Sequence, residues 1–356
     1  MRRTRLYWVT LLAGACASTA TETADLGAGS DAAAPADAST ELGCAARTPS
    51  LRFEEVSPPA PPDRWGHVAG YDAKRDRVVT FGGTGSGGRR SDVWTLGEAW
   101  SEWTDASQSP TRPTGRFTAG AVMDPERDRW IVMTGDDGVA RDDVWALALD
   151  TGVWAELPKG PSARFDVAAA LEGRRAWFYA GFAEGFVPLD DLWELDLDGD
   201  TWRELPTGPD RPSPRTNCAM GHHEGFLYVI GGHDDEDLTA DYWRYELAAE
   251  RWEPVEGPAL SAWAHFAYTR GAGPVLWMAG GDNDDFVDVS STWRVTLGSP
   301  LVIDELPLTG AAPPTRRHAT LSLRANGELV LYGGSFGKSG VRGDTWRGVI
   351  EAPRCD

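Results

Sequence analysis

The segment RVVTFGGTGSGGRRSDVWTL, residues 77–96, contains the pattern that decides the fold. It begins with a run of β-branched and aromatic residues, Val78 to Phe81, which has the length and composition of a buried strand. The run ends at Gly82-Gly83, and Asp92-Val93-Trp94 follows after a polar, glycine-rich loop. Because glycine turns tightly without a Cβ clash, the segment predicts two strands joined by a loop.

The same pattern recurs six times. A diglycine or an equivalent small pair stands at Gly82-Gly83, Thr134-Gly135, Ala180-Gly181, Gly231-Gly232, Gly280-Gly281 and Gly333-Gly334, at spacings of 52, 46, 51, 49 and 53 residues. A Trp, usually two places after an Asp, follows at Trp94, Trp145, Trp193, Trp243, Trp293 and Trp346, and a further Trp at Trp103, Trp154, Trp202 and Trp252. Such a period predicts a repeat architecture.

These marks, which are in phase from Leu51 to Ile350, resemble the kelch repeat. The resemblance implies an all-β fold, a six-bladed kelch-type β-propeller of the galactose oxidase type with four antiparallel strands in each blade. We expect both Trp series to fill the wedge between neighbouring sheets, since one Trp buries roughly 150–250 Å². The 356 residues then contain one ring and an N-terminal segment rather than two domains.

The N-terminal strand is expected to close the ring. The sixth repeat stops after Trp346, and residues 51–56, with Phe53 at the Trp position, match the missing outer strand. Closure would remove a free sheet edge. Antiparallel pairing would bring Cys355 near Cys44, so we predict a disulfide between them in an oxidising compartment. Cys218, inside an apolar run, is expected to be a buried free thiol.

Five repeats open on an Arg after a proline-rich turn, and the same five carry the Asp before the Trp. The fifth repeat has Ala262 at the Arg position, by alignment of its Trp263-Ala264-His265 with Trp65-Gly66-His67, and Ser291 at the Asp position. Pairing between neighbouring blades would strand two partners, whereas pairing within a blade strands none. We therefore predict structural ion pairs, in which Arg supplies a planar fork: Arg64–Asp92, Arg116–Asp143, Arg164–Asp191, Arg215–Asp241 and Arg316–Asp344.

Residues 1–15 have the composition of a secretory signal, with three Arg before an apolar stretch from Leu6 to Ala15. Residues 11–16 resemble a bacterial lipoprotein signal, which implies lipidation of Cys16, although Ala13 stands where that family more often has Leu. Ordinary cleavage after Ala15 and an uncleaved anchor are the alternatives. We expect residues 16–50 to be the anchor Cys and a flexible Ala- and Asp-rich linker, and residues 51–356 to be the propeller. The protein would be exported and lipid-anchored in the bacterial cell envelope, at the outer membrane or the periplasmic side, or secreted if Cys16 is not lipidated.

The charge of the chain is strongly acidic, with 34 Lys+Arg against 54 Asp+Glu and a net charge of −20, which argues against nucleic-acid binding. The loops that follow the diglycines differ in sign. Repeats one and six are basic, with Arg89, Arg90, Lys338 and Arg342. Repeats four and five are acidic, with Asp234, Asp235, Glu236, Asp237, Asp282, Asp284, Asp285 and Asp288. We expect one face to be divided into a basic and a larger acidic sector, which can steer a charged partner.

No catalytic motif stands out, because the six His show no metal-ligand spacing and no nucleophile elbow is present. We expect no cofactor; the acidic loops could take Ca²⁺, but residues 234–237 lack the spacing of an EF-hand loop, which favours solvated loops. The leading hypothesis is a non-catalytic binding or scaffold protein that presents its loops to an envelope protein or glycan. The alternative is a kelch-type carbohydrate-active enzyme, such as a sugar epimerase or mutarotase. Unpaired Arg, Glu and His at the channel mouth would favour the enzyme.

Overall fold

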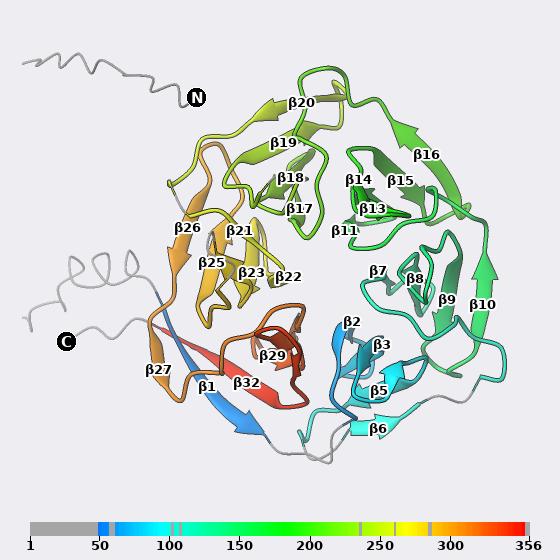
Figure 1. The fold of residues 1–356 in the computed structure, drawn as a ribbon, viewed down its shortest axis with the longest axis vertical. Coiled ribbons are helices and arrows are strands. Elements are labelled where there is room, and N and C mark those ends of the chain that lie inside the picture. Colours follow the sequence, from blue (N-terminus) through cyan, green and yellow to red (C-terminus); the bar gives the residue numbers. More distant parts are fainter. Residues whose placement is uncertain are drawn as a thin grey trace, which may run out of the picture.

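Six β-sheets stand around a central channel in the computed structural model, as Figure 1 shows. The structure describes residues 49–56, 61–100, 103–106, 109–234, 237–259, 261–283 and 287–352. In each sheet four antiparallel strands run from the channel outwards. The predicted all-β, six-bladed propeller is therefore confirmed. We number the blades 1 to 6 in chain order of their innermost strands.

The four strands of the blades have equivalent positions in all six sheets. The innermost strands are β2 (Trp65–Asp72), β7 (Gly120–Asp124), β11 (Ala168–Glu172), β17 (Ala219–His223), β22 (Ala267–Arg270) and β28 (Thr320–Leu323). The second strands are β3 (Arg77–Gly85), β8 (Arg129–Met133), β12 (Arg175–Tyr179), β18 (Phe226–Ile230), β23 (Val275–Ala279) and β29 (Leu329–Tyr332). The third strands are β5 (Val93–Leu96), β9 (Val144–Ala148), β15 (Leu192–Asp196), β19 (Tyr242–Glu246), β25 (Thr292–Thr296) and β32 (Thr345–Glu351). The outermost strands are β6 (Trp103–Asp105), β10 (Trp154–Leu157), β16 (Thr201–Leu205), β20 (Arg251–Pro254), β26 (Val302–Glu305) and β1 (Ser50–Val56).

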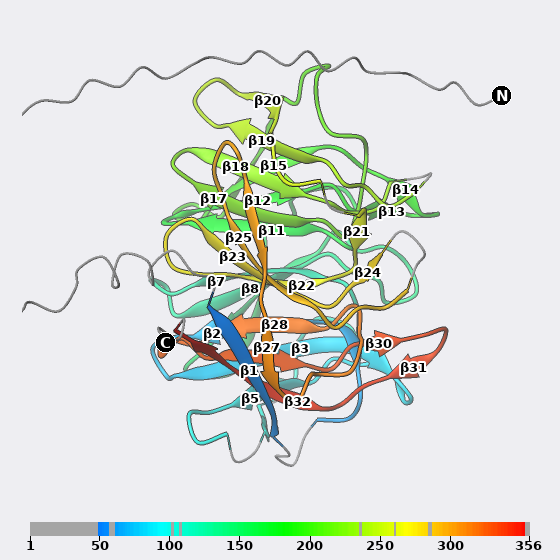
Figure 2. The same ribbon diagram turned by 90° about the vertical axis from the view of Figure 1, so that its left-hand side faces the viewer.

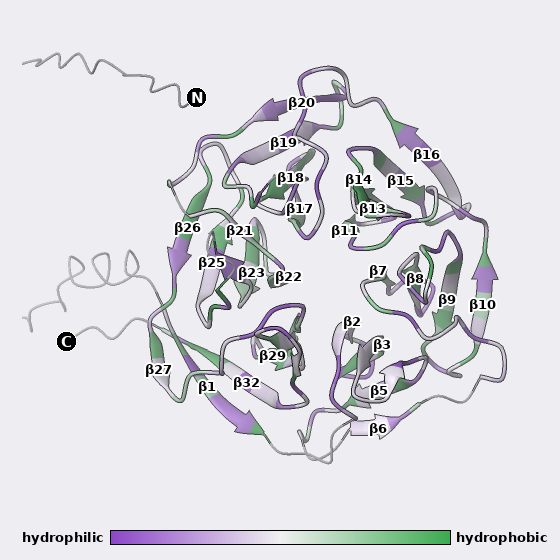
Figure 3. Ribbon diagram, viewed as in Figure 1, coloured by the Kyte–Doolittle hydropathy of each residue, from purple (hydrophilic) through white to green (hydrophobic). Residues whose placement is uncertain are grey.

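Burial decreases from the second strands to the rim of the ring. The second strands are apolar runs, such as β8 with four consecutive buried residues, because neighbouring blades cover both of their faces. The outermost strands β10 and β16 are largely hydrophilic (Figure 3) and expose half or more of their residues. The core is thus a ring of apolar layers between adjacent blades.

The N-terminal strand closes the ring, as predicted. β1 pairs antiparallel with β32, with Phe53 opposite Gly348 and Ser50 opposite Glu351. Phe53 is buried, and a Cβ at Gly348 would lie 2.8 Å from its ring, so this glycine makes room for Phe53. A short strand, β27 (Leu308–Gly310), pairs parallel with the other edge of β1 and covers it. Cys44 and Cys355 lie outside the described residues, so their disulfide stays a prediction.

The two Trp series differ in burial. Trp103, Trp154 and Trp252 of the outermost strands are buried between blades, and Trp202 is half-buried. In the third strands Trp346 is buried, but the other five Trp are half-buried. The prediction that both series fill the wedge is therefore right chiefly for the outermost strands, because the third-strand indoles lie beside polar partners described below.

The diglycine marks join each blade to the next. Gly82 has a φ of 75°, and a Cβ there would lie 2.6 Å from the carbonyl oxygen of Arg116 in blade 2. The amide of Gly83 donates to that same oxygen at 2.7 Å. In all six blades the second residue of the pair makes this bond to the following blade, at 2.7–3.0 Å. Close backbone approach explains the small residues.

The ring has two unlike faces. We call the loop face the one formed by the connections between second and third strands, residues 86–92, 134–143, 180–191, 231–241, 280–291 and 333–344. Six short strands lie on it: β4 (Gly88–Arg89), β13 (Phe182–Ala183), β14 (Val187–Pro188), β24 (Asp282–Asn283), β30 (Ser335–Phe336) and β31 (Gly340–Val341). Another, β21 (Trp263–Ala264), pairs with β24. β13, β14, β30 and β31 project from one side of the ring in Figure 2. The hairpin face, opposite, carries the turns between innermost and second strands.

Candidate functional site

All five predicted Arg–Asp pairs are present within single blades. Each guanidinium meets both carboxylate oxygens of its Asp at distances of 2.5–3.0 Å. Burial alone would raise the pKa of these Asp residues, but the Arg hydrogen bonds and charge outweigh it and lower the pKa. The five Arg side chains are almost completely buried, so their charges are paired inside the blades.

Each pair also holds the third-strand Trp. In blade 2 the Trp145 indole N–H donates to Asp143 at 2.8 Å, and the other four pairs repeat the contact at 2.6–2.7 Å. The Arg116 guanidinium also donates to the carbonyl of Thr134 at 2.9 Å. One Asp therefore orders an Arg, a Trp and the small-residue turn.

Blade 5 departs from the pattern, and the predicted alignment there was wrong by one residue. The Gly232 amide donates to Trp263 O, so Trp263, not Ala262, occupies the Arg position. Its indole N–H donates to Gly280 O at 3.4 Å, as the Arg side chains do to their own turns, and its ring packs against that of Trp293 in a tilted arrangement, with centroids 4.3 Å apart. The residue two places on, His265, has the positive φ found at Gly66. The predicted alignment was wrong because the Trp-x-His sequence occurs in blades 1 and 5 at positions that differ by one residue in the structure.

The loop face carries an apolar rim that the sequence analysis did not identify. Seven large hydrophobic residues are exposed among the described residues, and five of these lie on the loop face. We call these five the apolar rim: Val139, Phe186, Val187, Val287 and Phe336, between 38% and 70% exposed. The signal for it was present, since Phe186 and Phe336 each adjoin a glycine in a loop that follows the small-residue pair.

Aromatic and cationic neighbours support the rim. Phe186 packs against Phe165 and Phe182, with ring centroids 5.5 and 5.7 Å apart. The Arg342 guanidinium lies 4.1 Å from the centroid of the Phe336 ring. Each Phe is therefore backed by the fold while a large part of its surface faces solvent.

The predicted charge sectors are partly neutralised. Arg89 pairs with Asp136 of the next blade at 2.8 Å, and Arg90 lies 3.7 Å from Asp63. Asp282 is fully buried and contacts Arg317 at 3.1 Å. Counting charges only between the two marks had omitted Asp63 and Arg317, which lie outside those segments.

Several of the remaining charged candidates are held by contacts of the loops. Asp288 is 3.7 Å from Arg317, Lys338 is exposed, and Asp234 and Asp237 form a turn in which the Asp237 amide donates to Asp234 at 3.0 Å. Asp235, Glu236, Asp284 and Asp285 lie outside the described residues. Among the residues that the structure describes, no three His, Cys, Asp or Glu side chains are grouped as metal ligands. Calcium binding by these loops stays a prediction.

The channel mouth on the loop face is a ring of six residues, one from each blade. All have left-handed φ values between 51° and 63°: Gly66, Thr118, Asp166, Asn217, His265 and His318. Backbone hydrogen bonds link neighbours, such as Asp166 N to Thr118 O at 2.9 Å and His318 N to His265 O at 2.8 Å. Five of the six, all but His265, line a channel cavity of about 410 Å³. The side chains at this position differ between blades, whereas the Arg, Asp and Trp of the repeat pattern recur.

Two titratable groups of the mouth have strongly shifted pKa values. Burial raises the pKa of Asp166 to about 6, although His265, Asn217 and Thr118 oppose the rise. Burial, together with the charges of His265 and Arg317, lowers the pKa of His318 well below its usual range. Cys218 also lines the channel; it is buried with a free thiol, as predicted, and burial raises its pKa to about 12.

A second constellation lies beside the mouth. His265 Nδ1 is 2.7 Å from Asp282 Oδ1, and Arg317 contacts the other carboxylate oxygen. The His265 ring is 4.6 Å from His318 and 6.2 Å from His233. A buried carboxylate that fixes an imidazole nitrogen is an arrangement suited to general-base chemistry.

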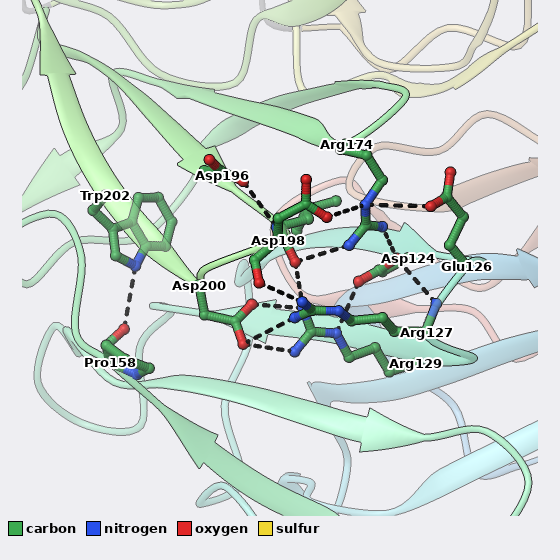
Figure 4. Close-up of polar contacts among 11 residues, drawn as sticks. Asp124, Glu126, Arg127, Arg129, Pro158, Arg174, Asp196, Asp198, Asp200 and Trp202 are labelled. Atoms are coloured by element: carbon green, nitrogen blue, oxygen red, sulfur yellow. Dashed lines mark hydrogen bonds and ion pairs between the residues drawn. The ribbon is translucent and has the colours of Figure 1, made fainter.

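The hairpin face is different, because a network of ion pairs connects blades 2 and 3 there (Figure 4). Asp124, fully buried, contacts Arg129 at 2.8 Å and Arg174 at 2.5 Å, and Arg129 reaches Asp200 at 2.5 Å. Between blades 1 and 2, Arg75 likewise reaches Asp128 at 2.6 Å. Residues 72–77 and 124–129 share a sequence pattern, with Asp at both ends of the turn and Arg after it. This pattern was a signal for these contacts.

Comparison with known proteins agrees with the repeat pattern. Residues 158–334 match the family model of the KLHDC2/KLHL20/DRC7 Kelch-repeats domain. No curated protein shows significant similarity to the chain. Kelch propellers generally mediate protein binding. Within the described residues, no helix has the length and hydropathy needed to cross a membrane.

Proposed function

We propose that this protein is a non-catalytic binding protein of the bacterial cell envelope whose loop face docks a partner protein. The observation that carries the proposal is the apolar rim, because exposed apolar residues gathered on one face mark interaction surfaces. Five of the seven large exposed hydrophobics of the described residues belong to it. Of the two partner classes, protein or glycan, Phe and Val side chains around a charged mouth favour a protein.

The fate of the repeat arginines supports a binding role. The five Arg residues that open the repeats are buried in ion pairs within their own blades. They are therefore not free to hold a substrate. The variable loops are left to make the contacts, which is the usual division between a rigid scaffold and its binding loops.

Site-specific photo-crosslinking in cells tests the proposal. A photoreactive phenylalanine analogue is placed at Phe186 or Phe336 on the rim, and at Val153 on the hairpin face, whose exposed fraction lies between those of the two Phe residues. We expect one protein adduct from both rim positions and none from Val153. Adducts of equal yield from all three positions would contradict the proposal.

The partner so identified is then measured in purified form. Phe186→Ser and Phe336→Ser should each weaken its binding at least tenfold, since large buried aromatics dominate binding energy. Val153→Ser is the matched control and should leave the affinity within twofold. Unchanged affinity of both rim variants would reject the rim as the docking surface.

The envelope location rests on the N-terminal sequence, where Cys16 would carry a lipid and residues 17–50 would form the tether. Cys16→Ser should abolish metabolic labelling with a palmitate analogue and move the protein from the membrane to the soluble fraction. Its melting temperature should not change. Labelling that persists in Cys16→Ser, or a wild-type protein without label, would contradict lipidation.

A kelch-type carbohydrate-active enzyme is the second candidate, and the His265–Asp282 contact at 2.7 Å is the observation that favours it. Asp282 would hold the imidazole for proton transfer, with Asp166 in the same mouth ring. Faster anomer exchange of reducing sugars, followed by NMR and lost in His265→Gln, would support this candidate. No acceleration by the wild-type protein would leave binding as the function.

A further inference from the structure

The channel below the mouth ring is a cavity with one charge at its entrance. It measures about 410 Å³, and its walls next to the ring come from small apolar residues such as Ala119, Val167 and Ala319. Among the described residues that line it, Asp166 is the sole acid and Arg270 the sole Lys or Arg. The two lie at opposite ends of the innermost strands.

The far end of the channel is already occupied by contacts of the protein itself. Arg270 forms an ion pair with Glu172 and donates to Leu171 O at 2.8 Å. The Tyr268 hydroxyl contacts the backbone nitrogen and oxygen of Ala169 at 3.0 and 3.2 Å, joining blades 5 and 3 across the channel. Arg270 is therefore neutralised at the far end of the channel from Asp166.

Asp166 is half-buried in the mouth ring and lacks the Arg partner that the five repeat Asp residues have. No Lys or Arg of the described residues forms an ion pair with it, and burial raises its pKa to about 6. At neutral pH most of this carboxylate is ionised, and a partly desolvated charge without a cation beside it is costly. Asn217 and Thr118 give it hydrogen bonds but no opposite charge, so this carboxylate at the cavity is a candidate binding group.

A second unused group is in the mouth. His318, in blade 6 and so across the ring from Asp166, has a buried Nδ1 with no hydrogen-bond partner among the described residues. Its lowered pKa keeps the imidazole neutral at pH 7, so one ring nitrogen can accept a hydrogen bond. The mouth therefore presents a carboxylate above apolar walls, with an uncharged imidazole on the opposite side of the ring.

We infer that the channel mouth binds an alkyl ammonium group, with Asp166 as its counter-ion and the Ala and Val walls in contact with its methylene chain. A primary ammonium offers a positive charge and three N–H donors, which the Asp166 carboxylate oxygens can accept. The overall net charge of −20 attracts cations towards the mouth. The group can come from a free alkylamine or from a lysine side chain of a protein, and the two share the same recognition chemistry.

Calorimetric titration of the full chain at pH 7.5 tests the inference with three probes. n-Butylammonium is the free amine, Nα-acetyl-lysine N-methylamide represents a protein side chain, and n-butanol is the neutral analogue. We expect saturable binding of at least one amine, at least tenfold tighter than that of n-butanol. Binding only by the free amine indicates a small-molecule ligand, and equal or tighter binding of the lysine derivative indicates a protein side chain.

Two variants assign the binding to the carboxylate. Asp166→Asn should weaken the amine at least tenfold, whereas Asp142→Asn, which removes an acid on the same face outside the channel lining, should leave it unchanged. Equal binding of butylammonium and butanol, no binding of either amine, or full affinity in Asp166→Asn would overturn the inference. The comparison of probes uses the unaltered protein and does not depend on a variant's folding. It needs no macromolecular partner, so its outcome is independent of the rim.

Discussion

Blade 2 joins its strands through charge, whereas blade 5 does so without it. In blade 2 the buried Arg116 bridges Asp143 and a turn carbonyl, and in blade 5 Trp263 and Ser291 stand at the same two positions. Trp263 keeps the hydrogen bond to the turn, and a tilted aromatic contact with Trp293 takes the place of the ion pair. The backbone contact to the preceding blade is the same in both.

The difference separates what the architecture requires from what it tolerates. The small-residue turn and its bond to the next blade occur in all six blades, but the ion pair occurs in five. A buried ion pair and a packed aromatic residue of similar size can stabilise a fold to a similar extent. An Arg–Asp pair can thus be replaced as a whole by well-packed side chains, as in blade 5. Replacing one partner alone leaves the other partner buried without its opposite charge.

The largest expected effect comes from breaking one pair. Asp143→Ala leaves the Arg116 charge buried without its carboxylate, so we expect a loss of about 3–5 kcal/mol in the free energy of unfolding. Ser291→Ala at the equivalent position of blade 5 should cost less than about 1 kcal/mol, since only the hydrogen bond to Glu305 is lost. Urea denaturation of both variants decides the matter, and equal losses would contradict the structural role of the pair.

Installing the pair in blade 5 sharpens the comparison. Trp263→Arg alone should be strongly destabilising, because it removes a buried indole and adds an unpaired buried charge. Adding Ser291→Asp should recover about 1–3 kcal/mol, the coupling expected of groups in contact. Additive losses in this double-mutant cycle would show that blade 5 cannot form the charged unit.

The ring closure, the six-fold repeat and the five pairs could be predicted because each depends on marks at fixed spacing. The Arg position of blade 5 could not be predicted, because Trp263-Ala264-His265 has the same Trp-x-His sequence as Trp65-Gly66-His67. In the structure Trp263 instead occupies the Arg position, one residue earlier in the repeat. Asp166 was also missed, because one Asp in a sequence does not show that the folded chain places it at a channel mouth without a Lys or Arg beside it. The apolar rim could not be predicted either, because the exposure of a Phe or Val in a loop depends on how that loop folds.

A smaller effect is expected at Asp166, which contrasts with the paired carboxylates. Its raised pKa means that the folded state holds this proton more tightly than the unfolded state does. Stability is therefore highest below pH 4, falls as the pH rises to about 6, and is then constant as far as this group is concerned. Asp166→Asn should remove that dependence and gain about 1–2 kcal/mol at pH 7, measured by denaturation across this range. A variant less stable than the wild type at pH 7 would show that the carboxylate is needed by the fold.

The most direct test of the division between repeat scaffold and binding face measures stability and partner affinity on the same two variants. Asp143→Ala should lower the melting temperature by several degrees and leave the affinity of its folded form for the crosslinked partner unchanged. Phe186→Ser should leave the melting temperature within about 2 °C and weaken binding at least tenfold. Loss of binding in Asp143→Ala with full binding in Phe186→Ser would contradict the assignment of structure to the repeat pairs and of recognition to the rim.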